Sequence, residues 1–241
     1  MDLAASTVAL ALAAVTLSTF IQFATGSGFG ILGGPLLLMI DPGLVPGPLL
    51  LLTVVVMLAV VWTERRGLRN VDLGWAALGA VPAGIGALWL VRMMDERVTE
   101  IVVGVAIAVG VIAGLAGWKV RQTRPALVVA GVLGGALSTI AATPGPPVVV
   151  VYRAADVSRY RANLSLFFVA TSVVSLSTLI VSGELDSTDV TAAAWLLPAV
   201  VLGALVAHFL VRLIPPRSIR PAALAMCLIS SVSLIVSALA G

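Results

Sequence analysis

The fold is decided by the stretch QFATGSGFGILGGP, residues 22–35, which interrupts an apolar run with five glycines and a proline. A bilayer core is about 30 Å thick, and the ten residues 31–40 rise only about 15 Å as a helix. The short segment therefore cannot cross a membrane as helix alone, and the glycine stretch must supply extended or unwound backbone. Such backbone is tolerated at membrane depth only where it is buried in protein or lines a wet cavity.

A second break, STIAATPGPP at residues 138–147, precedes another short apolar segment at 147–152. Its prolines, Pro144, Pro146 and Pro147, remove three amide donors and force an extended approach. An unbroken helix through this stretch is excluded, because prolines inside a helix kink or break it.

The composition predicts an all-α, polytopic membrane protein. Of the 241 residues, 60% are hydrophobic and 10% are charged, against about 25% charged in soluble domains, and the mean hydropathy is +1.15. Full-length spans are predicted at 3–24, 46–62, 73–91, 98–117, 126–141, 162–182, 190–211 and 221–240. The start Met1-Asp2 lacks the basic region of a signal peptide, so the first span is expected to stay in the protein.

Several other classes of protein are excluded. The net charge of +3 does not indicate nucleic-acid binding, because the basic residues form four short clusters between apolar runs. The single Cys227 and single His208 leave no internal disulfide, thiolate cluster or multi-histidine metal site, and we expect no cofactor. An intramembrane enzyme needs a nucleophile with a base at depth. Ser27 lies in Thr-Gly-Ser-Gly, unlike the Gly-x-Ser-Gly of a rhomboid protease, and the histidine lies in the other half of the chain.

The chain repeats itself. The segment GGPLLL at 33–38 recurs 112 residues later as GPPVVV at 145–150, and Gly86-Ala87-Leu88 recurs as Gly203-Ala204-Leu205. The conserved order predicts a duplication, with a first transmembrane repeat at 1–121 and a second at 122–241.

Charge predicts how the two repeats are oriented. If both short segments help to cross the membrane, each repeat has about five crossing elements, one of them a broken short helix, and the second repeat is inverted. Twelve of the 14 Lys and Arg then face the cytoplasm, as the positive-inside rule requires, and both termini lie outside. If each break lies within one crossing, the eight-span arrangement puts at most eight of the 14 inside. The basic loops are 63–72, 118–124, 152–161 and 212–220.

The two breaks predict a site for a small anion. We expect the amides of the glycine stretch to be free and to lie beside a half-helix that Pro35 begins, which together would form an anion site. Two half-helix N-termini that face each other near the midplane are typical of a secondary transporter. The alternative for the first break is helix packing, since Gly26, Gly30 and Gly34 form a small-xxx-small stripe. The candidate substrate-binding residues are Gln22, Thr25, Gly26, Ser27, Gly28, Gly30, Gly33, Gly34, Thr139, Thr143, Gly145, Val148, Arg161 and Asn163.

Two of these candidates, Arg161 and Asn163, are expected to open the span at 162–182. In a functional interpretation Arg161 draws anions to the cytoplasmic vestibule and Asn163 reaches the site. In the alternative Arg161 only sets the topology, and Arg66 has the same two interpretations.

The breaks also carry a resemblance. Gln22, Thr25-Gly26, Phe29-Gly30 and Pro35-Leu36-Leu37 resemble the first-repeat signature of the TauE/SafE sulfite exporter family, and Arg66-Gly67 with Asn70-Val71-Asp72 resembles its first cytoplasmic loop. Gly145-Pro146-Pro147, Tyr152 and Arg161-Ala162-Asn163-Leu164 resemble its second-repeat signature. The resemblance covers essentially the whole chain and implies transport of small sulfur-containing or organic anions such as sulfite or sulfonates.

We therefore predict a secondary transporter, an exporter or permease of the cell (inner) membrane, that works by alternating access. Its partners would be the small anion, the bilayer and possibly a second copy of the chain; an anion channel is the alternative. No carboxylate is predicted mid-membrane, which argues against a proton relay. An exporter needs none, because a leaving monoanion gains about 2.3 kcal/mol per 100 mV.

Overall fold

The computed structural model describes residues 5–68, 73–91 and 120–210, with isolated positions between 93 and 112 and at 232 and 236. Every regular element in this part of the chain is a helix, which confirms the all-α prediction. Four helices are long and apolar enough to cross a membrane: α1 (Ala5–Thr25), α6 (Arg124–Ala141), α8 (Val157–Ser182) and α9 (Ser187–Leu210). The others are α2 (Phe29–Ile40), α3 (Gly47–Thr63), α4 (Gly74–Val91), α7 (Gly145–Val151) and the short turns η1 (Pro42–Leu44) and η2 (Arg65–Gly67).

The predicted spans match these helices closely at most ends, and α8 is the exception. It begins at Val157, five residues before the predicted 162, because the Asp156 carboxylate accepts a hydrogen bond from the Arg159 amide (2.8 Å) and caps the helix there. The expectation that Arg161 and Asn163 open this helix was therefore wrong. Both residues lie inside its first two turns. The predicted span 221–240, and 98–117 apart from isolated positions, lie outside the described residues.

Both predicted breaks are present. Gly26, between α1 and α2, has φ of +84°, and Ala142, between α6 and α7, has φ of 53°. The expectation that Pro35 begins the first half-helix was wrong. The helix begins at Phe29, with Pro35 as its seventh residue, because a side chain from α1 satisfies the amides at its start, as described below.

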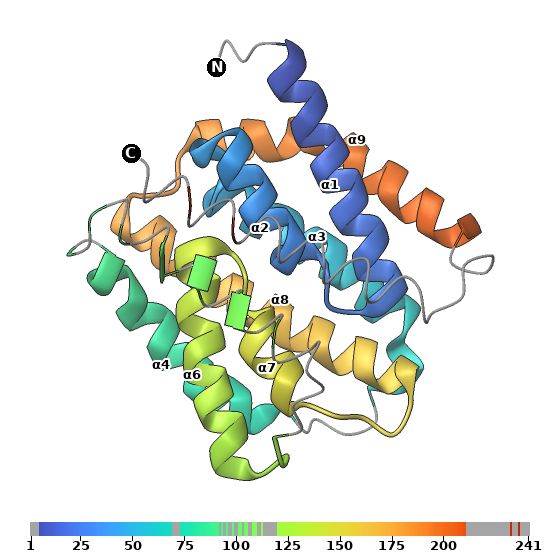
Figure 1. The fold of residues 1–241 in the computed structure, drawn as a ribbon, viewed down its shortest axis with the longest axis vertical. Coiled ribbons are helices and arrows are strands. Elements are labelled where there is room, and N and C mark those ends of the chain that lie inside the picture. Colours follow the sequence, from blue (N-terminus) through green and yellow to red (C-terminus); the bar gives the residue numbers. More distant parts are fainter. Residues whose placement is uncertain are drawn as a thin grey trace.

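Each break reverses the chain. Gly33 on α2 lies against Ser18 on α1, and Gly28 lies against Ile21, so residues before and after the break face each other. Gly134 on α6 lies in the same way against Pro144 and Val148 around the second break. Figure 1 shows α2 lying beside α1. The two breaks are therefore hairpins between helices.

Helices from the two halves of the chain pack against each other in matching pairs. Helix α4 packs on α6 and α1 packs on α9, while α4 also contacts α8 and α3 contacts α9. Helix α3 packs on α8, and α2 touches α7. If α1, α2, α3 and α4 are exchanged with α6, α7, α8 and α9, in that order, the set of contacts between the two halves stays the same.

The pairing of α4 with α6 depends on small residues. A Cβ atom at Gly131 would collide with the Ala76 carbonyl oxygen, and one at Gly135 with the Ala80 carbonyl oxygen. The missing side chains let the two backbones touch, as in small-xxx-small packing within membranes.

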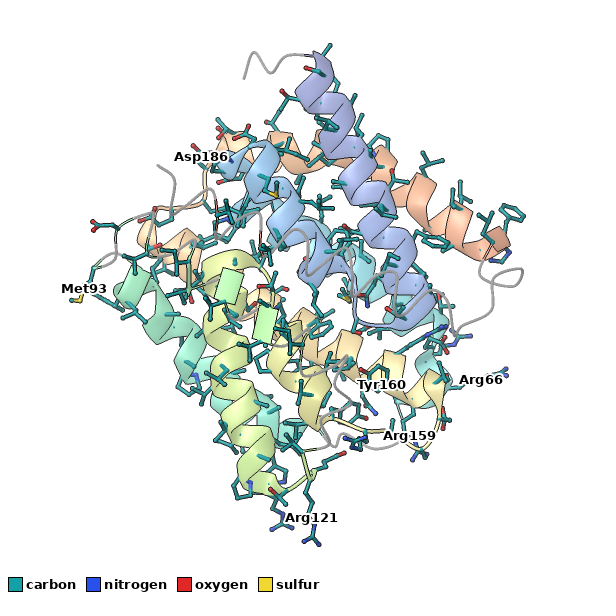
Figure 2. All side chains as sticks on the ribbon, in the orientation of Figure 1. Arg66, Met93, Arg121, Arg159, Tyr160 and Asp186 are labelled. Carbon is teal, nitrogen blue, oxygen red and sulfur yellow. The ribbon has the colours of Figure 1, made fainter. Side chains whose placement is uncertain are left out.

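The described basic loops meet at one end of the molecule. The turn η2 packs against the start of α8, where a Cβ at Gly67 would lie 2.7 Å from the Ser158 carbonyl oxygen. The Arg153 amide donates to the Gln122 side chain (2.9 Å), which joins loop 118–124 to loop 152–161. Figure 2 shows Arg66, Arg121 and Arg159 at this end, and Asp186 and Met93 at the other. We call these the basic end and the acidic end.

At the acidic end the Asp186 carboxylate accepts hydrogen bonds from the Thr188 hydroxyl and from the amides of Thr188 and Asp189 at the start of α9. These hydrogen bonds lower the pKa of Asp186 below its usual value, and the bond from the Thr188 hydroxyl contributes most. The segment before α3 lies nearby, since a Cβ at Gly47 would be 2.7 Å from an Asp189 carboxylate oxygen.

Candidate functional site

A small cavity lies between the two breaks, and we call it the central cavity. Its empty volume is about 230 Å³, but the space that the centre of a water molecule can reach is enough for about one water. The first break, the second break and the middles of α3 and α8 all contribute to its wall. The lining residues are Gln22, Ser27, Gly30, Ile31, Thr53, Met57, Ala142, Pro144, Gly145 and Phe168.

Gln22 holds the first break in place. Its side-chain oxygen accepts hydrogen bonds from the Gly28 amide (2.7 Å) and the Phe29 amide (3.0 Å), so it caps the start of α2 from within α1. These two amides are therefore not free for an anion, contrary to the sequence-based picture of a bare glycine stretch. Their capping also explains why α2 begins at Phe29.

The other end of the Gln22 side chain is unsatisfied. Gln22 is fully buried, and its nitrogen Nε2 has no hydrogen-bond partner among the described residues. The two amides that bind the oxygen fix which way the side-chain amide points, because only an oxygen can accept both bonds. The NH₂ group is thus a buried donor in the wall of the central cavity.

The remaining residues of the first break have mixed positions. Ser27 lines the cavity, whereas the Thr25 hydroxyl donates to the Ile21 carbonyl within α1 (2.9 Å). Gly26 lies against the stem of Arg161, and Gly33 lies against Ser18 rather than the cavity. Of the candidate polar side chains near the first break, Gln22 and Ser27 line the cavity.

The glycine stripe packs against the second break. A Cβ at Gly30 would lie 2.6 Å from the Ala142 carbonyl oxygen, and one at Gly34 2.6 Å from the Thr143 methyl carbon. The packing interpretation of these glycines therefore holds for contact between the two breaks, although no continuous helix runs through them. Close approach of α2 to the second break is what keeps the central cavity small.

In the second break, Gly145 lines the cavity and lies against the Ile31 side chain. The Thr143 hydroxyl is fully buried and has no hydrogen-bond partner within the described part of the chain. Val148 is buried in the apolar core. Thr139 does not line the central cavity, and its hydroxyl donates a hydrogen bond to the Gly84 carbonyl oxygen (2.9 Å).

Arg161 lies beneath the first break at the basic end. It donates to the Ala24 carbonyl oxygen near the end of α1 (2.5 Å), and it forms an ion pair with Glu64 at the end of α3 (3.4 Å). The Ser158 hydroxyl donates to the other Glu64 oxygen (2.6 Å). Asn163, by contrast, donates to the Tyr152 hydroxyl (2.9 Å) and does not line the cavity.

Six lining residues were missed as candidates by sequence reasoning. Ile31, Ala142 and Pro144 belong to the two broken stretches, whereas Thr53, Met57 and Phe168 lie outside them. The latter three lie in the middle of spans whose sequence carries no break or charge. Of these three, Thr53 alone had a signal, since it is the single hydroxyl in the apolar run 46–62.

The lining residues contain donors but no ionisable side chain. The described residues also contain no group of three or more His, Cys, Asp or Glu that could hold a metal ion. A guest that accepts hydrogen bonds suits such a wall, because the buried amide nitrogen of Gln22 can only donate.

Helices long and apolar enough to cross a membrane, two chain reversals and a small cavity between them are consistent with a polytopic membrane transporter. The chain matches the family described as "Sulfite exporter TauE/SafE" over residues 10–234, and it belongs to that family. This membership confirms the prediction of a transporter rather than an enzyme.

A curated relative is the "Probable inner membrane transporter protein TsaS" of Comamonas testosteroni. It is 28% identical over 186 residues, which cover 70% of this chain and 75% of the relative. No solved structure matches the chain.

Proposed function

We propose that the protein is a secondary transporter that carries a small sulfur-containing or organic anion, such as sulfite or a sulfonate, by alternating access. The observation that carries the proposal is the buried Gln22 side chain, which lines the cavity between the two breaks and whose amide nitrogen has no hydrogen-bond partner in the described part of the chain. The family description supports the transport of a sulfite-like anion, and the name of the relative supports a transporter of the inner membrane.

The chemistry of the cavity supports an oxyanion as substrate. An oxyanion accepts hydrogen bonds from amide and hydroxyl donors, and a bond to a charged acceptor is roughly twice as strong as a neutral one. The donors would be Gln22 and Ser27, with the buried Thr143 hydroxyl between the two lining residues Ala142 and Pro144. A neutral wall also suits a carrier, which must release its substrate as well as bind it.

The size of the central cavity supports alternating access over a channel. It holds about one water, so an anion can enter only if the walls move. At the basic end the Arg161–Glu64 ion pair and the Arg161–Ala24 hydrogen bond join α8 to α3 and α1 beneath the cavity. We take this contact to be the closed entrance from the basic end.

We further propose that the chain consists of two inverted repeats, 1–121 and 122–241. The matching helix pairs, in which α1–α4 exchange with α6–α9, support this relation, and so do the two chain reversals. The basic end would then face the cytoplasm of a bacterial cell, since positively charged loops stay inside, and both termini would lie outside.

The experiment is a flux screen in proteoliposomes with sulfite, thiosulfate, alkylsulfonates and carboxylates, under an imposed potential. We expect saturable flux of at least one sulfur oxyanion and counterflow, in which unlabelled substrate on one side drives labelled substrate from the other. Conductance far above carrier rates would instead favour the channel. No saturable flux of any anion would overturn the proposal.

A further inference from the structure

A second polar feature lies nearer the acidic end, on α6 and α8. The hydroxyl oxygens of Thr139 and Ser175 lie 2.9 Å apart, and the Ser175 hydroxyl donates to that of Ser138 (3.0 Å). Ser172 lies one turn before Ser175 on the same face of α8. All four residues are buried, and we call them the hydroxyl cluster.

The hydroxyl cluster lies beside the central cavity. Ala142 and Phe168 are two of the residues in the wall of that cavity. Ser138 precedes Ala142 by four residues, and Ser172 follows Phe168 by four, so each lies one helical turn from the wall. The cluster therefore lies within one helical turn of the cavity wall on both α6 and α8.

On its other side the cluster meets a larger cavity. This second cavity has an empty volume of about 870 Å³ and is lined by Thr139, by Leu179, which lies one turn beyond Ser175, and by the segment before α3. Glu184 and Asp189 also line it, so it reaches the acidic end. The cluster thus lies between the two cavities.

One member of the cluster has no structural task that explains its hydroxyl. Ser172 is fully buried, and its oxygen has no hydrogen-bond partner among the residues that the structure describes. A buried hydroxyl without a partner is unfavourable, and alanine would fill the same place in a helix without that cost. The three partnered hydroxyls could serve only to join α6 to α8, but Ser172 does not contribute to that contact.

We infer that the hydroxyl cluster is a second substrate subsite, which binds the oxyanion between the central cavity and the cavity at the acidic end. The inference rests on the proposed transport function and names a step in it. Ser172 donates to the passing anion, and Ser138, which accepts from the Ser175 hydroxyl, can turn its own hydroxyl hydrogen toward the anion. Because the subsite is neutral, it stabilises the anion in transit without holding it as a cation would.

The test compares Ser172→Ala with Thr171→Val in proteoliposomes, using sulfite as the probe. Thr171 is the matched control, because its buried hydroxyl is bonded to carbonyl oxygens of its own helix. For Ser172→Ala we expect the maximal flux to fall about tenfold, the loss expected for one hydrogen bond to a charged group. Equilibrium sulfite binding, measured by calorimetry, and the melting temperature should stay at wild-type values, and Thr171→Val should transport normally.

Wild-type flux in Ser172→Ala would overturn the subsite, as would a loss of flux that only follows a loss of folded protein. If Ser172→Ala loses folded protein, Ser172→Cys decides instead, because cysteine is close to serine in size but is a weak donor. Reduced flux of Ser172→Cys at an unchanged melting temperature supports the subsite, and wild-type flux overturns it. Absence of saturable flux in the wild type would overturn the transport function and the subsite together. Normal wild-type flux with a normal Ser172→Ala overturns the subsite alone.

Discussion

At the scale of single residues, Gln22 combines two tasks in one side chain. Its oxygen caps α2, and its nitrogen is an unpaired donor, among the described residues, on a side chain that lines the central cavity. Gln22→Glu separates the tasks, because a carboxylate still accepts from the Gly28 and Phe29 amides but has no donor for an anion. We expect the melting temperature to be retained and the affinity for sulfite at pH 8 to fall at least about tenfold.

Calorimetric titration with sulfite and thermal unfolding in detergent measure both quantities for Gln22→Glu. Gln22→Leu serves as the contrast, since it should lose stability as well by leaving two buried amides without an acceptor. Wild-type affinity in Gln22→Glu would show that the amide nitrogen does not touch the substrate.

Arg161 also has a role that its charge alone did not reveal. It ties the end of α1 to the end of α3 through Ala24 and Glu64, so Glu64→Ala should loosen the basic end and favour opening of the central cavity. With Cys227→Ser and Ser27→Cys introduced, we expect maleimide to label position 27 several-fold faster in Glu64→Ala.

Arg65→Ala is the control for this labelling, because Arg65 is a cation of the same end that stacks on the Trp62 ring, 5.1 Å from its centroid. Equal labelling rates with and without Glu64 would mean that the ion pair is not what closes the cavity.

At the scale of elements, glycines decide how closely helices approach. Gly135 lies where α6 touches the Ala80 carbonyl oxygen of α4, while a Cβ at Gly86 on α4 would meet nothing within 4 Å. Gly135→Ala should destabilise the protein by about 1–3 kcal/mol through overpacking. Gly86→Ala should be neutral or stabilising by up to about 1 kcal/mol, since alanine favours helix.

Unfolding in detergent, followed by circular dichroism or by aggregation on heating, compares the two variants. Equal behaviour would contradict the close contact of α4 with α6, and with it the pairing of helices from the two halves of the chain.

At the scale of the whole molecule, the two ends differ in charge and the membrane potential acts across them. If an anion moves alone from the basic end to the acidic end, an interior-negative potential of 100 mV supplies about 2.3 kcal/mol, or roughly a fiftyfold concentration ratio. Efflux from proteoliposomes should therefore accelerate when a potassium gradient with valinomycin makes the interior negative. Collapse of the potential with equal potassium is the control, and flux that ignores the potential would indicate an electroneutral coupled process.

The helices and the two breaks could be predicted from the sequence for a simple physical reason. Apolar length, glycine and proline act locally, so the interruption at 22–35 and the one at 138–147 could be located without knowing what they contact. The residues at which two of the helices begin were harder to predict. The start of α2 depends on Gln22, which lies in the preceding helix, and the start of α8 depends on the Asp156 cap.

Hydropathy and backbone propensity are properties of short stretches, so they were sufficient to predict a helical membrane protein with two interrupted segments. The folded structure was needed to see that Gln22 caps one break, with its nitrogen unpaired among the described residues, and that Arg161 pairs with Glu64. It was also needed to find Thr53, Met57 and Phe168 in the cavity wall. These features join residues from α1, α3 and α8, and contacts between distant segments follow from how the helices pack rather than from any local pattern.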